Sequence, residues 1–147
     1  MIAAMPRPAP SHRADYRGFH PVATRWADND AYGHMNNAIY FSLFDTAVTA
    51  WLMARGLIGQ GDGPMWVVAE AGCRYLAELG FPDALEVGLR VGRMGASSVR
   101  WELGLFREGE AQASAEAHFV HVHVARQGRR AEPIPAAMRG ALEGLML

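Results

Sequence analysis

The segment that most constrains the fold is residues 36–55, which have the spacing of an α-helix and are apolar around most of its circumference. Only a narrow stripe is polar, formed by Ser42, Asp45, Thr46 and Thr49. A surface helix normally has one apolar face, so a helix that is apolar on most sides must be enclosed by other elements. Asn36 (or His34) is a suitable N-cap, and Gly56 after Arg55 is a suitable end. We therefore expect one long, buried helix.

The rest of the chain is dominated by apolar residues that alternate with polar ones, which is the pattern of half-buried β-strands. Strands are expected at residues 19–26, 65–75, 85–91, 99–106 and 111–125, and a short helix at 136–146. Pro21 places the first strand near a sheet edge, because proline donates no ladder hydrogen bond. The breaks between the later strands are short and contain glycine, which indicates an antiparallel meander.

The last of these strands changes phase along its length. Ala113, Ala115, Ala117 and Phe119 are apolar at odd positions, whereas Val120, Val122 and Val124 are apolar at even positions. Side chains that alternate with a period of two cannot change parity without an extra residue. We therefore expect a β-bulge near His118–Val120.

Together these elements predict a single α+β domain over residues 18–147, in which a curved antiparallel sheet of about five strands wraps the long helix. Residues 1–17 are rich in proline and are expected to form a flexible leader. Because the sheet covers the helix on one side only, the remaining apolar helix surface favours a homo-oligomer.

Composition argues against several classes of protein. The chain has 147 residues, is 50% hydrophobic and carries a net charge of -1, so we expect no general nucleic-acid binding. The single cysteine, Cys73, allows no intrachain disulfide and no thiolate metal cluster, and it fits a reducing cytoplasm. The apolar runs are too short to cross a membrane, and residues 1–17 lack the apolar region of a secretory signal. We expect a cytoplasmic protein.

The candidate functional residues gather in the turn before the long helix, where the chain places Asp28, Asp30, His34, Asn36 and Asn37. A helix N-terminus offers unpaired amides and the positive end of the helix dipole. Hydrolysis of a thioester needs a base or nucleophile at the carbonyl carbon and donors for the oxyanion. We expect Asp30 to be the base or nucleophile, with His34, Asn37 and the first helix amides around the carbonyl. Asp28 is more simply explained as a residue that holds the turn.

The same turn resembles a known family. Its pattern, Asp28-x-Asp30-x-x-Gly-His-Met-Asn-Asn-x-x-Tyr40, is similar to that of the 4-hydroxybenzoyl-CoA thioesterase-like branch of the hotdog-fold acyl-CoA thioesterases. The resemblance continues in Arg74-Tyr75 and in the turn that starts at Phe81. It implies a hotdog fold, hydrolysis of an acyl thioester, no metal or other cofactor, and a homodimer or homotetramer with active sites between subunits. Asp30 matches the catalytic carboxylate of the family.

The resemblance also implies a set of substrate-binding residues, namely Tyr32, Gly33, Asn36, Tyr40, Arg93 and Ser98. His34 matches a histidine of the related plant acyl carrier protein thioesterases, but Tyr32 stands where those enzymes have asparagine. Some relatives carry several basic residues before the Ser98 position, where this chain has only Arg93. The carrier of the acyl group, coenzyme A or a protein, therefore stays open, and Arg126, Arg129 and Arg130 are other candidates for contacts with its phosphates.

Two other functions remain open at this stage. A hotdog dehydratase or hydratase would use a histidine base such as His34 with an acid such as Asp30, and a non-catalytic protein would bind acyl thioesters without turnover. A metal site and a serine-hydrolase site are not expected. His121 and His123 share a strand face but lack the further ligands of a zinc site, and no serine lies in a Gly-x-Ser-x-Gly pattern.

Overall fold

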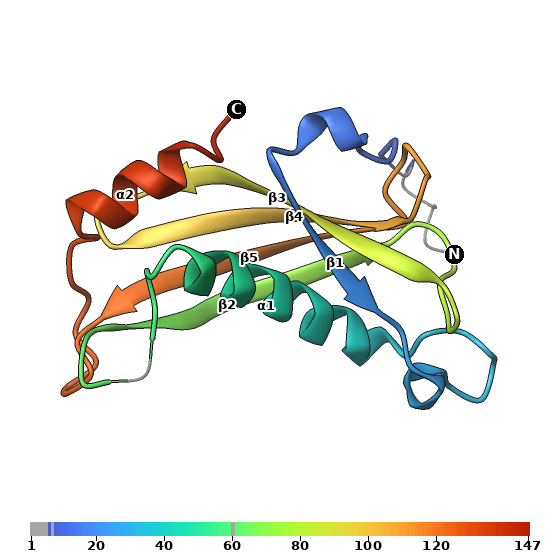
Figure 1. Ribbon diagram of the computed structural model, residues 1–147, viewed down its shortest axis with the longest axis horizontal. Coiled ribbons are helices and arrows are strands. Elements are labelled where there is room, and N and C mark those ends of the chain that lie inside the picture. The colour runs from blue at the N-terminus through green and yellow to red at the C-terminus, as the bar shows by residue number, and fades with distance from the viewer. Residues whose placement is uncertain (1–5, 7, 60) are drawn as a thin grey trace.

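The computed structural model describes residues 6, 8–59 and 61–147. The elements in chain order are η1 (Arg13–Asp15), β1 (Gly18–Ala23), η2 (Trp26–Asp28), α1 (Asn37–Ala54), β2 (Met65–Tyr75), β3 (Ala84–Met94), β4 (Ser98–Arg107), β5 (Ala115–Val124) and α2 (Ala136–Glu143). The five strands form one antiparallel sheet in the order β1-β3-β4-β5-β2, which curves around α1 (Figure 1). This arrangement confirms the α+β hotdog fold.

The long helix has the expected ends. The side chain of Asn36 accepts a hydrogen bond from the Ala38 amide over 2.9 Å, which caps the N-terminus of α1. After Ala54 the chain reverses at Gly56, whose φ of 65° lies in the left-handed region that favours glycine. The residues of α1 that are buried against the sheet are Tyr40, Phe44, Ala47, Val48, Trp51 and Leu52.

The core lies between α1 and the concave face of the sheet. The buried face of β4 is formed by Val99, Trp101, Leu103 and Leu105. Trp101 meets Trp51 of α1 edge to face, with 5.7 Å between the ring centroids. The face of the sheet that is turned away from α1 is its outer face.

The prediction of a β-bulge near His118–Val120 in β5 is wrong. β5 pairs with β4 without any shift of register. The irregularity lies in the neighbouring strand β2, whose register against β5 shifts between Val68 and Glu70. The sheet therefore has a bulge at this level, but on the opposite strand.

The phase of β5 does not change because two histidines continue its buried face. His121 and His123 are only 6% and 3% exposed, and they follow the buried Phe119. The indole nitrogen of Trp101 donates a hydrogen bond to Nδ1 of His121 over 3.2 Å, so the imidazole keeps a partner inside the core. A sequence pattern that counts histidine as polar assigns the buried face to the wrong residues.

We expect the free energy of unfolding to fall as the pH drops below about 6.5, the ordinary pKa of histidine. Burial lowers the pKa of His121, so below its ordinary value the unfolded chain binds a proton that the folded chain does not. The stabilisation is complete above the unfolded-state pKa and is lost as the pH falls towards the folded-state pKa. Urea unfolding at several pH values, with His121→Gln as comparison, measures this. Equal pH dependence in both proteins would contradict the assignment.

The expected meander is only partly correct. β3, β4 and β5 follow one another as neighbours, but β2 pairs with β5 at the far edge of the sheet. The connection at residues 76–83 therefore crosses the end of the sheet instead of forming a hairpin. This crossing brings it beside the turn before α1, where the Met35 amide donates to the Leu79 carbonyl over 2.7 Å and the Phe81 amide donates to Asn29 Oδ1 over 3.0 Å.

Part of the expected leader is packed against the outer face. The Ser11 amide donates to Glu116, and the Ser11 and Tyr16 hydroxyls lie 2.8 Å apart. Tyr16 is buried and meets Phe106 edge to face. Ordered packing thus begins before the expected boundary at residue 18, while residues 1–5 and 7 lie outside the described part of the chain.

Within the described part of the chain, neither helix combines the length and hydrophobicity that a membrane crossing requires.

Candidate active site

A cavity of about 430 Å³ is lined by residues from the start of α1 and from the connection between β2 and β3. These two segments lie at the same end of the molecule (Figure 1). Its lining consists of Asp30, His34, Met35, Asn37, Tyr40, Tyr75, Leu76, Ala77 and Glu78. The lining includes all the residues with an expected catalytic role and one expected to bind substrate, Tyr40. The cavity combines acid–base groups with an aromatic and aliphatic wall, as small-molecule sites commonly do.

Asp28 holds the turn that carries these residues. It is only 2% exposed, and its carboxylate accepts hydrogen bonds from the backbone amide and the guanidinium of Arg25. The guanidinium beside it keeps the pKa of Asp28 below the ordinary value. The Asp28 carbonyl also accepts the amide of Asn36 over 2.8 Å. These contacts use both the carboxylate and the carbonyl group of Asp28 to hold the turn. Asp28 therefore has a structural role, which differs from the role expected of Asp30.

Asp30 has one oxygen fixed by the turn and one oxygen without a partner. Its Oδ1 accepts the Tyr32 amide over 2.8 Å and the His34 amide over 3.4 Å. Among the residues that the structure describes, Oδ2 makes no hydrogen bond. The turn thus orients the carboxyl group while leaving an oxygen free to accept a proton or to attack a carbonyl carbon.

The start of α1, where Asn37 lines the same cavity, has an amide without an acceptor among the described residues. The Ala38 amide is capped by Asn36 Oδ1 and the Ile39 amide by the Asn36 carbonyl. For the Asn37 amide, the described residues provide no acceptor. This N–H group, at the positive end of the helix dipole, can donate to an oxygen that gains negative charge.

Glu78 and Tyr75 are two site residues that the sequence did not reveal. Nε2 of His34 lies 3.1 Å from Oε2 of Glu78, so the partner of this imidazole comes from the crossing connection. The Tyr75 hydroxyl donates to the Asn37 carbonyl over 3.1 Å. Arg74-Tyr75 contributed to the resemblance, but no pattern in the sequence indicated which residue Tyr75 would contact.

Other expected binding residues lie outside the cavity lining. Tyr32 is 84% exposed. Gly33 has a φ of 81° that the turn requires, and the Asn36 side chain is used as the helix cap. Arg93 and Ser98 line a separate cavity of about 340 Å³ on the outer face, together with Gly95, Arg100 and Val120. One chain therefore does not bring Arg93 and Ser98 together with Asp30.

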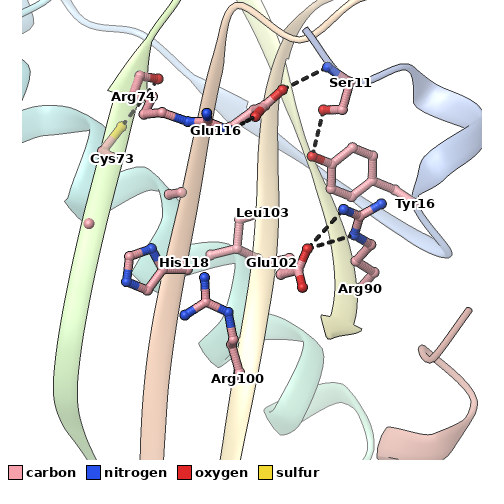
Figure 2. A pocket seen from close by; sticks show the side chains of 12 residues that line it. Ser11, Tyr16, Cys73, Arg74, Arg90, Arg100, Glu102, Leu103, Glu116 and His118 are labelled. Carbon is pink, nitrogen blue, oxygen red and sulfur yellow. Dashed lines mark hydrogen bonds and ion pairs between the residues drawn. The ribbon is translucent and has the colours of Figure 1, made fainter. Parts of the chain in front are cut away.

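A larger cavity of about 500 Å³ also lies on the outer face and contains none of the expected site residues (Figure 2). Its charged side chains are largely paired with one another. Arg74 lies 2.7 Å from Glu116, and Arg90 lies 2.8 Å from Glu102. His118 and Arg100, which also line it, lie 2.9 Å and 3.7 Å from Glu70. Most charges of this cavity are therefore paired within the described residues, unlike the second carboxylate oxygen of Asp30.

Tyr40 in the cavity lining and Cys73 in β2 are protonated at neutral pH. Burial raises the pKa of Tyr40 to about 12 and that of the Cys73 thiol to about 11. The thiol of Cys73 is therefore not a thiolate nucleophile at neutral pH. In the described ranges, no group of three or more His, Cys, Asp or Glu side chains could hold a metal ion.

Comparison with known proteins adds to this geometry. A model of the thioesterase-like superfamily matches residues 24–142, a range that contains α1, the turn before it and strands β2 to β5. The PA5185 protein of Pseudomonas aeruginosa strain PAO1 is 46% identical, with a TM-score of 0.90 over 93% of this chain and 96% of that chain. The PA2801 protein of Pseudomonas aeruginosa is 31% identical, with a TM-score of 0.81 over 86% and 98% of the chains.

A thioesterase from Thermus thermophilus, in complex with coenzyme A and Zn, is 29% identical and has a TM-score of 0.74 over 89% of this chain and 95% of that chain. The fold, the range matched by the family model and the sequence identities all indicate the same family. The chain is thus a member of the thioesterase-like superfamily with the hotdog fold.

Proposed function

We propose that this protein hydrolyses an acyl thioester, with an acyl-CoA as the substrate, to a free acid and a thiol. One observation carries the proposal. Asp30, whose carboxylate is half paired, and Asn37, whose amide has no acceptor among the described residues, line the same cavity. A base or nucleophile and an oxyanion donor are the two groups that acyl transfer from a thioester requires.

The chemistry follows from these positions. The Asn37 amide, with His34 beside it, holds the thioester carbonyl oxygen. Asp30 either takes a proton from a water molecule that attacks the carbonyl carbon or attacks that carbon itself. The carbon–sulfur bond breaks, and the sulfur leaves as a thiolate that takes up a proton. If Asp30 attacks, the acyl–aspartate anhydride that forms is hydrolysed by a water molecule, which releases the acid and restores the carboxylate. On either route one water molecule is consumed, and its hydroxyl and hydrogen end in the acid and the thiol.

Coenzyme A as the acyl carrier is supported by the thioesterase from Thermus thermophilus, whose structure contains coenzyme A. Arg93, the single charged residue before the Ser98 position, and Ser98 itself are proposed to contact the carrier. Arg93 and Ser98 lie on the outer face, away from Asp30. They can contact the carrier of a thioester bound beside Asp30 only if the carrier extends that far or if they belong to a neighbouring subunit.

A screen of thiol release tests the proposal. The wild-type protein is incubated with acyl-CoA substrates that carry short, long and aromatic acyl groups, and the free thiol is measured with a thiol reagent. Release above the rate in buffer for at least one class is expected. Binding of these substrates without release would favour a non-catalytic acyl-thioester-binding protein.

A dehydratase or hydratase is the second candidate, and the contact between His34 and Glu78 favours it. An imidazole paired with a carboxylate from another element is the arrangement that such an enzyme uses as a base. Formation of a double bond from a 3-hydroxyacyl thioester, without release of thiol, would support this candidate against hydrolysis.

We also propose a cytoplasmic homo-oligomer, a dimer or a tetramer, assembled through the edge of β2. This strand is the last in the sheet, and its Val68 is 50% exposed. Ile39, Phe41 and Leu43 of α1 are only partly buried. An uncovered strand edge beside apolar side chains readily pairs with the same edge of a second copy.

Lysine at position 68 should therefore shift the protein towards the monomer, because a charge on an exposed edge disfavours strand pairing. Light scattering after size-exclusion chromatography compares the mass of Val68→Lys with the wild type, whose single chain has a mass of 16.0 kDa. A wild type that is already monomeric, or a variant of unchanged mass, would contradict assembly through β2.

A further inference from the structure

The peptide group between Asn37 and Ala38 is held at both of its polar atoms. Its carbonyl oxygen accepts a hydrogen bond from the hydroxyl of Tyr75, the last residue of β2, over 3.1 Å. Its amide donates to Oδ1 of Asn36 over 2.9 Å. The side chains of Asn36 and Tyr75 therefore clamp this peptide plane from the turn and from the sheet.

The clamp adjoins the amide that the proposed reaction uses. The Asn37 N–H group, for which the described chain offers no acceptor, is separated from the clamped plane only by the Cα atom of Asn37. A plane that cannot rotate limits the direction in which this N–H group points. An oxyanion donor works when it already points to the place where the charge develops, at about 2.7–3.1 Å from the oxygen.

The ring of Tyr75 is itself held in place. It meets the ring of Tyr40 edge to face, with 4.8 Å between the centroids and an angle of 90° between the planes. Tyr40 is buried in the first turns of α1, and both tyrosines line the cavity beside Asp30. The aromatic contact thus brings the end of β2 against the same part of α1 on which the hydroxyl acts.

The hydroxyl contributes little to folding as such. Tyr75 is 42% exposed, so water can replace the Asn37 carbonyl as its partner, and the net gain from the hydrogen bond is small. Its consequence lies in the orientation of the helix start. Groups that support a site in this way decide how closely the reacting geometry is kept.

We propose that Tyr75 is a positioning residue, which directs the Asn37 amide at the thioester carbonyl oxygen through its hydrogen bond to the Asn37 carbonyl. The inference rests on the proposed thioester hydrolysis and adds a residue that neither the resemblance nor the turn motif assigns. Tyr75 needs no contact with substrate for this role.

Tyr75→Phe tests the inference because it keeps the ring and removes only the hydroxyl. We expect kcat to fall about tenfold while KM stays within about twofold, since the lost alignment matters mainly in the transition state. The dissociation constant of a thioether analogue of the substrate, which has no carbonyl group, should not change. The matched control is Tyr16→Phe, which loses the hydroxyl contact with Ser11 on the outer face and should keep its kcat (Figure 2).

The outcomes separate the inference from the function on which it rests. If the wild type releases no thiol from any acyl-CoA, both fail. If release depends on Asp30 but Tyr75→Phe has the kcat of the wild type, only the inference fails. It also fails if the loss disappears once kcat is corrected for the folded fraction, or if the thioether binds more weakly in proportion, because these results indicate a merely structural role.

Discussion

Asp30→Asn should lower the rate of thiol release by about 10²- to 10⁴-fold, the range for the loss of a general base. The amide has nearly the shape of the carboxyl group, and its oxygen can still accept the Tyr32 amide, so the turn should remain intact. It can neither take a proton from water nor attack the carbonyl carbon. Steady-state assays on the best substrate of the wild type measure the effect.

Asp45→Asn is the matched control for this experiment. Asp45 is exposed on the polar stripe of α1, outside the lining of the cavity beside Asp30. The control variant should keep the wild-type rate, and both variants should unfold at the temperature of the wild type. Undiminished activity in Asp30→Asn would reject the catalytic assignment of Asp30.

Asn37→Pro should lower kcat by about 10²- to 10³-fold, the cost of removing one oxyanion donor. Asn37 is the first residue of α1, a position where proline is favoured because its missing N–H has no helical acceptor. The preceding Asn36 has φ and ψ of -55° and 135°, which suit a residue before proline. The substitution therefore removes the proposed donor without breaking the helix.

Asn37→Ala separates the backbone amide from the side chain. Alanine keeps the N–H group and removes the carboxamide, so its kcat should stay much closer to the wild type than that of the proline variant. Melting temperatures of both variants check that α1 is retained. Equal losses in the two variants would show that the side chain of Asn37, and not its amide, acts on the substrate.

Local signals in the sequence predicted much of this protein. The helix ends followed from Asn36 and Gly56, because capping depends on neighbouring residues alone. The position of Pro21 in an edge strand followed from its missing N–H group. The turn before α1 places Asp30 near the helix start for the same local reason, since only a few residues separate them.

Contacts between distant segments were harder to predict. The crossing connection from β2 to β3 has the glycine and proline of a hairpin turn, and its composition does not reveal that β2 pairs with β5. Glu78 and Tyr75 enter the cavity only because of that crossing. The buried face of β5 was predicted wrongly because His121 counts as polar in the sequence pattern, and its hydrogen-bond partner, Trp101, lies on another strand. Each of these errors concerns a pairing that the sequence does not encode locally.

The most direct test of the account is a crystal structure of the Asp30→Asn variant in complex with an acyl-CoA that the wild-type protein hydrolyses. We predict a carbonyl oxygen at about 2.7–3.1 Å from the Asn37 amide nitrogen, as an oxyanion donor requires, and the carbonyl carbon facing the side chain of residue 30. A thioester bound in the outer-face cavity of Arg93 and Ser98, with its carbonyl group away from the start of α1, would contradict the account.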